Sequence, residues 1–450
     1  MRMLELIHKI VWGPWLMALF LAAGLFYTFR SKGFQVRGVI CWWRATAGSF
    51  FSSAQSTVPR REQLKTACTA LAATVGTGNI VGVATAITSG GPGALFWMWI
   101  SAAIGMMTAY GEVYLGMISR FQDKEGNMMC GPFVYLRDLA KKPGLAFLYG
   151  LLCLLCSLGM GSMVQANSLA ETASYSFGIP KPGAAVFLGL LTAVMIRGGR
   201  QQIRQAAEKL VPISAGIYIL FSVFLLFVCR QSLPAVFQEI FREAFRFRAA
   251  AGGVSGYGIS LAIRYGLARG VFSNEAGLGS LAVLHGDSPG QNPKLQGMWA
   301  MFEVFFDTIV VCTLTGLVIL CSLKEKGVLT GDCELTGAAL TSWCFSRYFG
   351  SWGFYLVSVS LILFAFATII AWYYLGSQAL CYLMGERNKR KKKIETIYQL
   401  CYVSAVIWGC IAALGKVWML SDILNGLMAL PNITALFLLS GFVIFPEDMA

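Results

Sequence analysis

The chain alternates long apolar runs with short polar breaks. Eleven apolar runs are candidate membrane helices, at 10–29, 64–89, 93–119, 145–171, 182–196, 210–229, 257–284, 296–322, 351–380, 397–415 and 418–445. About 20 apolar residues in a helix cross a hydrocarbon core of about 30 Å. The longest polar breaks, 30–63, 120–144 and 230–256, have the size of loops. We therefore predict one all-α integral membrane domain covering residues 1–450, with about 11 transmembrane helices.

The composition agrees with this prediction. Hydrophobic residues make up 56% of the chain and charged residues 13%, against about 25% charged in a soluble domain. The net charge of +14 does not indicate a nucleic-acid partner, because the basic residues lie in loops and not on one face. The thirteen cysteines lack the spacing of a disulfide framework, and we interpret them, Cys153 and Cys156 included, as packing residues.

Basic residues cluster after the first, third, fifth and ninth spans. The positive-inside rule makes these four loops cytoplasmic, which places the N-terminus outside and the C-terminus inside a plasma membrane. The segment "FREAFRFR" (241–248) puts arginines on the outer side, and we interpret it as an amphipathic helix in the interface. The first span has no small-residue cleavage site and is expected to be a permanent helix.

Two spans carry glycine breaks at corresponding positions. The sequence "GTGN" (76–79) interrupts the second span and "EAGLGS" (275–280) interrupts the seventh. Each break lies in the first helix of a block of five spans, and five is odd, so the second block enters the membrane from the opposite side. This pattern predicts an inverted repeat, with an extra helix at about 10–29, repeat one at about 64–229 and repeat two at about 257–445.

A broken helix has a chemical consequence. It frees backbone groups in the bilayer, which is tolerated only where they face a cavity or an ion. The N-terminus of the second half-helix suits a carboxylate, and carbonyls at the end of the first half suit a small cation. The alternative for Gly78 and Gly82 is a GxxxG helix contact.

Five segments resemble the alanine/glycine:cation symporter family of sodium-coupled amino-acid transporters. They are "GTGNIVGVATAITSGGPGALFWMWISAAIGMMTAYGE" (76–112), "GMGSMVQANS" (159–168), "ARGVFSNEAGLGS" (268–280), "QGMWAMFEVFFDTIVVCT" (296–313) and "FAFATIIAWYYLG" (364–376). The resemblance implies the LeuT-like fold, with five plus five inverted helices. It also implies import of small neutral amino acids, alanine and glycine, by alternating access with Na⁺ as the coupling ion.

The resemblance implies roles for individual residues. The amides of Thr77 and Gly78 would take the substrate carboxylate, Gln165 would bond one end of the substrate, and Phe272 would close the apolar side of the pocket. The remaining positions that it assigns are Gly277 and Gly279, which narrow the facing break; the backbone of Ala72 and Val75 with the Thr368 hydroxyl, which form the principal Na⁺ site; Thr74 and Asn79, at a possible second ion site; and Ser273, at another ion position and beside the substrate.

The sequence departs from the family pattern at Ala367, where a hydroxyl is usual. Proton coupling within the same fold is therefore the alternative to Na⁺. Ser377 and Ala109 replace an acidic residue and a lysine that are common in the family, which puts the gating contacts in question.

Four carboxylates, Glu112, Glu275, Glu303 and Asp307, lie in or near spans, where ionisable residues default to function. Glu275 sits beside the second break. We interpret it as an acceptor for the amides freed there or a partner of Arg269, with a gate or ion role as the alternative. Glu112 and Asp307 are expected to tie helices together or end them at the interface.

Two other classes of protein are weaker fits. "GVSG" (253–256) with His285 offers a Ser255–His285 pair for an intramembrane serine protease. A channel needs symmetric rings of ligands, which two non-identical breaks do not supply. We therefore expect a transporter and not an enzyme, with no organic cofactor, functioning as a monomer in the lipid bilayer.

Overall fold

The computed structural model describes residues 2–51, 60–124, 126–245, 261–288, 290, 292–327, 335–385 and 391–446. Most of these residues are helical, and one antiparallel hairpin, β1 (Phe121–Gln122) with β2 (Met128–Met129), lies in the loop after the third predicted span. Residues 246–260 are outside the described residues. The proposed Ser255 of the protease pair and the end of "FREAFRFR" therefore fall outside them too.

The N-terminal segment forms short helices before the repeats: α1 (Arg2–Val11), α2 (Pro14–Arg30), α3 (Phe34–Arg37), α4 (Val39–Ala45) and η1 (Ala47–Phe51). Gly13 and Pro14 separate α1 from α2, because proline lacks the amide that would continue the helix but is favoured in a first turn. The predicted first span corresponds to α2 together with the end of α1.

The five spans of predicted repeat one are all helical. They comprise α5 (Arg60–Thr74), η2 (Thr77–Asn79) and α6 (Val81–Gly90); α7 (Gly93–Ser119); α8 (Pro132–Asp138), α9 (Pro143–Leu158), η3 (Gly159–Val164) and α10 (Gln165–Phe177); α11 (Lys181–Arg197); and α12 (Gly199–Val228). The chain bends by 55° between α5 and the segment 77–90. The predicted break in the second span is confirmed.

Predicted repeat two follows the surface helix α13 (Leu233–Ala244). The helices of this repeat are α14 (Leu261–Asn274), α15 (Ser280–Leu284) and η4 (His285–Asp287); α16 (Pro293–Val304), η5 (Phe305–Cys312) and α17 (Thr313–Lys326); α18 (Gly337–Phe349); α19 (Ser351–Met384); α20 (Lys391–Ile411); and α21 (Leu414–Leu438) with η7 (Ser440–Phe442). The chain leaves helical geometry between α14 and α15, which confirms the predicted break in the seventh span.

Each of the eleven predicted spans contains helix, but not every one of these helices is long and apolar enough to cross a membrane by itself. Among the described residues, eight helices are long and apolar enough to cross a membrane, or nine with the bent second span. The short α11, with 17 residues, and the interrupted pair α14 and α15 do not pass. A 17-residue helix is about 26 Å long, which suits a thin or locally deformed bilayer.

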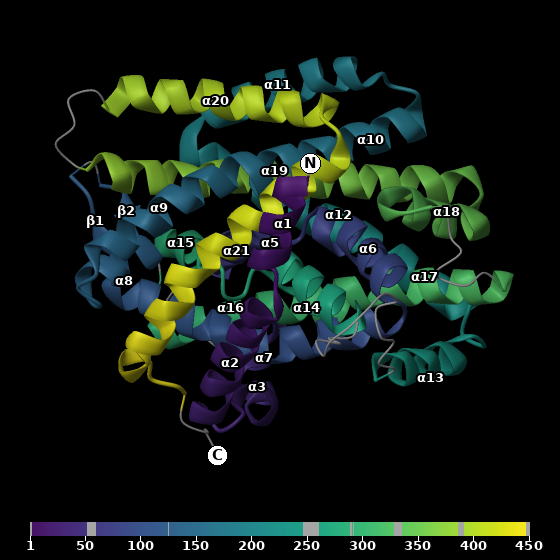
Figure 1. Cartoon of the computed structure of the whole chain (residues 1–450), viewed down its shortest axis with the longest axis horizontal. Helices are drawn as coiled ribbons and strands as arrows, with labels where there is room; N and C mark the ends of the chain where they lie inside the picture. The colour runs from purple at the N-terminus through teal and green to yellow at the C-terminus, as the bar shows by residue number, and fades with distance from the viewer. Residues whose placement is uncertain are drawn as a thin grey trace.

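The discontinuous helices lie inside the bundle. In Figure 1, α11 and α20 run along one side and α7 with α2 along the other, while α5, α14 and α15 lie between them. Helix α7 packs on α14 and α16, and α19 packs on α9, α10, α12 and α18. The outer helices turn large apolar side chains outward, including Phe187, Leu190, Leu220, Phe224 and Phe227. An apolar exterior suits a lipid environment, and the buried polar groups lie among the apolar residues of the interior.

Candidate substrate and ion site at the helix breaks

The first break is stabilised by side-chain contacts to its freed amides. The Gly76 amide donates to Asn79 Oδ1 at 2.9 Å, and the Thr77 amide donates to Gln165 Oε1 at 3.3 Å. Gln165 begins α10, directly after the π-helical turn η3. Two of the predicted site residues, Thr77 and Gln165, are thus in contact. A substrate carboxylate that binds the Thr77 amide has to displace the Gln165 oxygen.

Glycine is required at the break because other helices approach it closely. A β carbon on Gly76 would lie 2.5 Å from Thr368 Oγ1 and 3.3 Å from Gln165 Oε1. One on Gly78 would lie 3.1 Å from the Cα atom of Ser273. Three other helices, α10, α14 and α19, therefore meet at this break. The structure brings five of the predicted site residues together at this break: Thr77, Gly78, Gln165, Ser273 and Thr368. It does not bring Gly277 and Gly279 there.

Gly82 behaves differently from Gly76 and Gly78. A β carbon on Gly82 would meet nothing within 4 Å. A GxxxG contact needs close approach of another helix at both glycines. The helix-contact interpretation of Gly78 and Gly82 is therefore wrong, and the glycines at the break serve the break itself.

The second break spans residues 275–279. Glu275, Gly277 and Gly279 have φ values of +58°, +95° and +80°, in the left-handed region that favours glycine. The Gly277 carbonyl accepts from Asn432 Nδ2 at 2.9 Å, and Tyr149 donates to the Leu278 carbonyl at 2.9 Å. A β carbon on Gly277 would lie 2.5 Å from Phe20 of the first span. One on Gly279 would lie 2.3 Å from Pro132 of α8. Both glycines are therefore packed against neighbouring helices.

Glu275 has two donors in the bundle interior. Trp372 Nε1 donates to Oε1 at 3.0 Å, and the Ser280 hydroxyl donates to Oε2. The carboxylate is buried and bridges the break to α19 and α15. The role is structural, but both donors are side chains and not the freed amides that were predicted. The predicted pairing with Arg269 is also wrong. Arg269 pairs with Asp422 instead.

Glu112 ties helices together, as expected. Asn432 Nδ2 donates to its carboxylate, and Tyr135 donates to Asn432 Oδ1. Since Asn432 also holds the Gly277 carbonyl, this network connects α7, α8 and α21 to the second break.

Asp307 lies at the centre of the site and not at the interface. Asn79 Nδ2 donates to Oδ1 at 2.6 Å, while the Ser273 and Thr308 hydroxyls each donate to Oδ2 at 2.8 Å. The carboxylate is fully buried, in the π-helical segment η5, a feature frequent at functional sites. It joins residues at the two breaks, Asn79 and Ser273. Asp307 ties helices together, as one of the two expectations had it. The other expectation, that it ends a helix at the interface, is wrong. The signal in the sequence is a carboxylate within a span.

The predicted ion residues occupy two separate places. Ala72, Val75 and Thr368 are buried, and the Thr368 hydroxyl donates to the Phe364 carbonyl at 3.0 Å while facing Gly76. Asn79 belongs to the Asp307 cluster. The Thr74 hydroxyl points back along its own helix, 3.4 Å from the Leu71 carbonyl.

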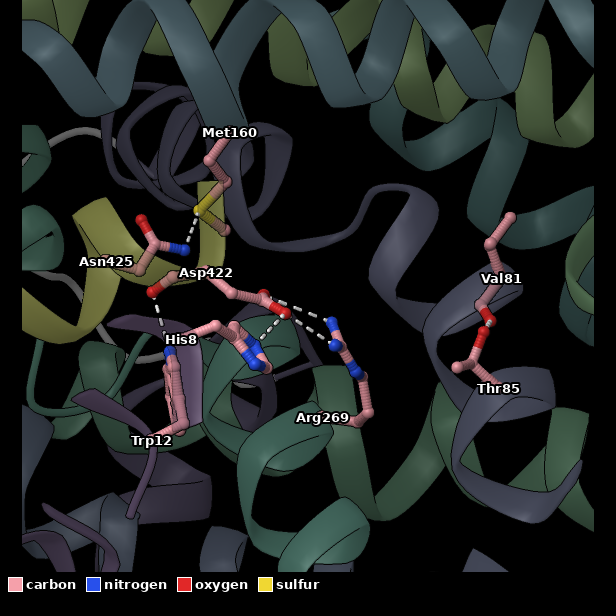
Figure 2. Close-up of polar contacts among 8 residues, drawn as sticks. All are labelled: His8, Trp12, Val81, Thr85, Met160, Arg269, Asp422 and Asn425. Carbon is pink, nitrogen blue, oxygen red and sulfur yellow. Dashed lines mark hydrogen bonds and ion pairs between the residues drawn. The ribbon is translucent and has the colours of Figure 1, made fainter. Parts of the chain in front are cut away.

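Phe272, next to Ser273 in α14, belongs to a pair of stacked rings. Phe272 stacks on Trp418 with ring centroids 5.0 Å apart, and the Arg269 guanidinium lies 5.4 Å and 5.1 Å from the two rings. Arg269 Nη2 is 2.7 Å from Asp422 Oδ2. His8 Nε2 of α1 lies 3.3 Å from the same oxygen, so Asp422 sits between two basic side chains (Figure 2).

Trp418 and Asp422 were not predicted from the sequence. They lie one turn apart in α21, far along the chain from Phe272 and Arg269. The signal in the sequence is an aspartate within the last predicted span, 418–445.

His285 is engaged on both ring nitrogens. Nδ1 is 3.0 Å from Gln296 Oε1 and Nε2 is 3.0 Å from Glu303 Oε2, all within the bundle. A catalytic base needs one nitrogen directed at its nucleophile. His285 and Glu303 instead link η4 to α16.

Two discontinuous helices whose breaks meet at a buried polar cluster, inside one bundle with an apolar exterior, define a secondary transporter. The model of the sodium:alanine symporter family matches residues 1–446. The chain belongs to this family. It is a sodium-coupled, multi-pass membrane symporter of amino acids and not an enzyme.

Relatives and solved structures agree with this assignment. The sodium/alanine symporter AgcS of Methanococcus maripaludis is 37% identical over 97% of this chain and 94% of its own length. The probable sodium/glutamine symporter GlnT of Bacillus subtilis is 34% identical over 97% and 87%. The solved structure of a Na⁺-coupled sialic acid symporter superposes with a TM-score of 0.57 at 13% identity, covering 98% of this chain and 99% of that one. The LeuT-like fold predicted from the sequence is confirmed.

Proposed function

We propose that this symporter imports small neutral amino acids, alanine and glycine, driven by Na⁺. The observation that carries the proposal is the crowding at the first break. Backbone amides there lie within a wall made by Gly76, Gly78 and the side chains of Thr368 and Ser273. A site bounded this tightly leaves room for a small substrate side chain.

In this proposal the carboxylate binds the amides of Thr77 and Gly78 after Gln165 moves aside. Gln165 then bonds one end of the substrate, and Ser273 and Phe272 line its side-chain end. Gly277 and Gly279 shape the second break. The half-helix α6, which starts after the break, contributes its positive dipole end to the anionic group.

We assign two ion positions to the two places where the predicted ion residues lie. The carbonyls of Ala72 and Val75 and the Thr368 hydroxyl supply hard oxygen ligands for the principal Na⁺. A second cation belongs near Asn79, Ser273 and Asp307. A buried carboxylate that has only neutral donors is costly until a cation or proton neutralises it, which supports Asp307 as its ligand. Thr74 contributes to the second ion only if its hydroxyl leaves the Leu71 carbonyl.

We further propose a functional monomer with the N-terminus outside and the C-terminus inside a plasma membrane, with repeats at about 64–229 and 257–445. The contact between α1 and the Arg269–Asp422 pair supports this orientation. Helix α1 then lies on the same side as the ends of α6, α10 and α18, which the charge pattern of the loops places outside.

The test is uptake of labelled alanine into proteoliposomes that hold the purified protein. An inward Na⁺ gradient with an inside-negative potential should concentrate alanine, while K⁺ should not. A zwitterionic substrate has no net charge, so each Na⁺ moves one net charge inward. The membrane potential then supplies about 2.3 kcal/mol per 100 mV for each Na⁺. This free energy supports roughly 40-fold accumulation of alanine at that potential. If an H⁺ gradient alone drives uptake, then H⁺ and not Na⁺ is the coupling ion, and Asp307 is the favoured site for the proton. No concentrative uptake of alanine, glycine or serine would overturn the substrate class.

A further inference from the structure

The side-chain amide of Asn425, in α21, is buried and poorly paired. Asn425 is 1% exposed, and its Nδ2 group donates to the Met160 sulfur of η3 at 2.8 Å (Figure 2). A thioether sulfur is a weak acceptor. The oxygen of the same amide, Oδ1, has no hydrogen-bond partner among the described residues. A buried acceptor without a partner costs free energy, so its presence calls for a donor that can reach it.

Gln165 contacts the same methionine. Its Nε2 group donates to the Met160 carbonyl, and its Oε1 atom accepts from the Thr77 amide, both at 3.3 Å. Both distances exceed the usual range of about 2.7–3.2 Å for such bonds, so Gln165 is held loosely at each end of its amide. Helix α21 approaches η3 closely here, because a β carbon on Gly159 would lie 3.1 Å from Ser421 Oγ.

Substrate binding gives the Gln165 amide new partners. In the proposed function the carboxylate binds the Thr77 amide, and Gln165 moves aside and bonds the other end of the substrate, the ammonium group. An ammonium group is only a donor, so it bonds Gln165 Oε1. The Nε2 group then needs an acceptor on the protein. Asn425 Oδ1 is a buried acceptor without a partner among the described residues, and its amide contacts Met160 as Gln165 does.

We propose that Asn425 Oδ1 accepts a hydrogen bond from Gln165 Nε2 when substrate is bound. This inference rests on the proposed function. Rotation of the Gln165 side chain between staggered rotamers moves its amide from the Met160 carbonyl to Asn425. The new bond keeps the Gln165 carbonyl oxygen directed at the substrate ammonium group. Asn425 is therefore a positioning residue, which acts on the substrate through Gln165 and does not touch it.

The test is a double-mutant cycle on the binding of labelled alanine to the purified protein in saturating Na⁺. Asn425→Leu removes the acceptor and keeps the approximate size of the side chain. It should weaken alanine binding about three- to tenfold, the loss expected for one hydrogen bond between neutral groups. In a Gln165→Met background, Asn425→Leu should weaken binding no further, because the partner of Asn425 is already gone.

Met160→Leu is the matched control. It removes the sulfur that Asn425 contacts in the structure, and it leaves both the Met160 carbonyl position and Asn425 Oδ1 in place. Since leucine and methionine are similar in volume, alanine binding should stay at the wild-type value. An effect of Asn425 that came only from holding η3 to α21 would appear in Met160→Leu as well.

The melting temperature supplies a second readout, which does not depend on the Gln165 variant. Without alanine, Asn425→Leu should melt no lower than wild type, because it removes a buried oxygen that lacks a partner. With alanine added, the rise in melting temperature should be smaller than in wild type, because the ligand binds less tightly.

Three results would overturn the inference and leave the proposed function standing. They are a lower melting temperature of Asn425→Leu without alanine, an equal loss of binding in Met160→Leu, and an undiminished effect of Asn425→Leu in the Gln165→Met background. Wild type that binds no alanine with Na⁺ would overturn both the inference and the proposed function.

Discussion

The substitution Gly76→Ala tests whether close packing at the first break controls Na⁺ binding. The same substitution at Gly82, in the same span, adds the methyl group where there is space. The β carbon of Gly76→Ala would lie 2.5 Å from Thr368 Oγ1, where ordinary contacts begin at 3.4 Å. Thr368 has to retreat by about 0.9 Å (3.4 − 2.5) or rotate. Rotation breaks its 3.0 Å hydrogen bond to the Phe364 carbonyl and moves a proposed Na⁺ ligand.

The magnitude follows from the cost of overpacking. Inserting a methylene-sized group into a packed interior costs about 1–3 kcal/mol, which is about 5- to 150-fold in an equilibrium constant. We expect the Na⁺ concentration for half-maximal alanine uptake to rise by a factor in this range. The assay is initial uptake into proteoliposomes over a series of Na⁺ concentrations at fixed membrane potential.

Gly82→Ala is the matched control, because its β carbon would meet nothing within 4 Å. In helix α6 this change should leave the Na⁺ dependence unaltered. It should also raise thermal stability slightly, since alanine is favoured over glycine in helices by about 1 kcal/mol. Unchanged Na⁺ dependence in Gly76→Ala, or an equal loss in Gly82→Ala, would refute the argument that α19 closes on the first break at this glycine.

Three further changes test the other parts of the site. Thr368→Ala should raise the Na⁺ requirement for uptake without changing expression or the melting temperature by much. Asp307→Asn removes the buried charge and keeps the shape of the side chain, so each alanine should be transported with one cation fewer. The measurement is the ratio of charge to alanine, by electrophysiology on solid-supported membranes, and this ratio should fall. An unchanged ratio would exclude Asp307 as an ion ligand. Trp372→Phe leaves Glu275 Oε1 without its donor, so the free energy of unfolding should fall by about 1–3 kcal/mol. The measurement is the melting temperature, compared with that of Tyr373→Phe.

The breaks themselves could be read from the sequence. Three glycines within seven positions of an apolar run conflict with a continuous helix, and a second break in the corresponding helix makes the pattern a repeat. These are local signals, because glycine's preference and the apolar run length need no knowledge of neighbours. The 55° bend at the second span and the positive φ values at Gly277 and Gly279 bear them out.

The partners of the buried charges were decided by the tertiary structure. Asp307, Asn79 and Ser273 come from three different spans, and Arg269 and Asp422 are 153 residues apart. A carboxylate in a span indicates only that some partner exists, since its charge is too costly to bury alone. Which partner it finds depends on how helices rotate and cross, and that is set by the packing of many side chains together. The sequence alone therefore determined the membrane fold and the position of the breaks, and the bundle decided which polar groups face one another there.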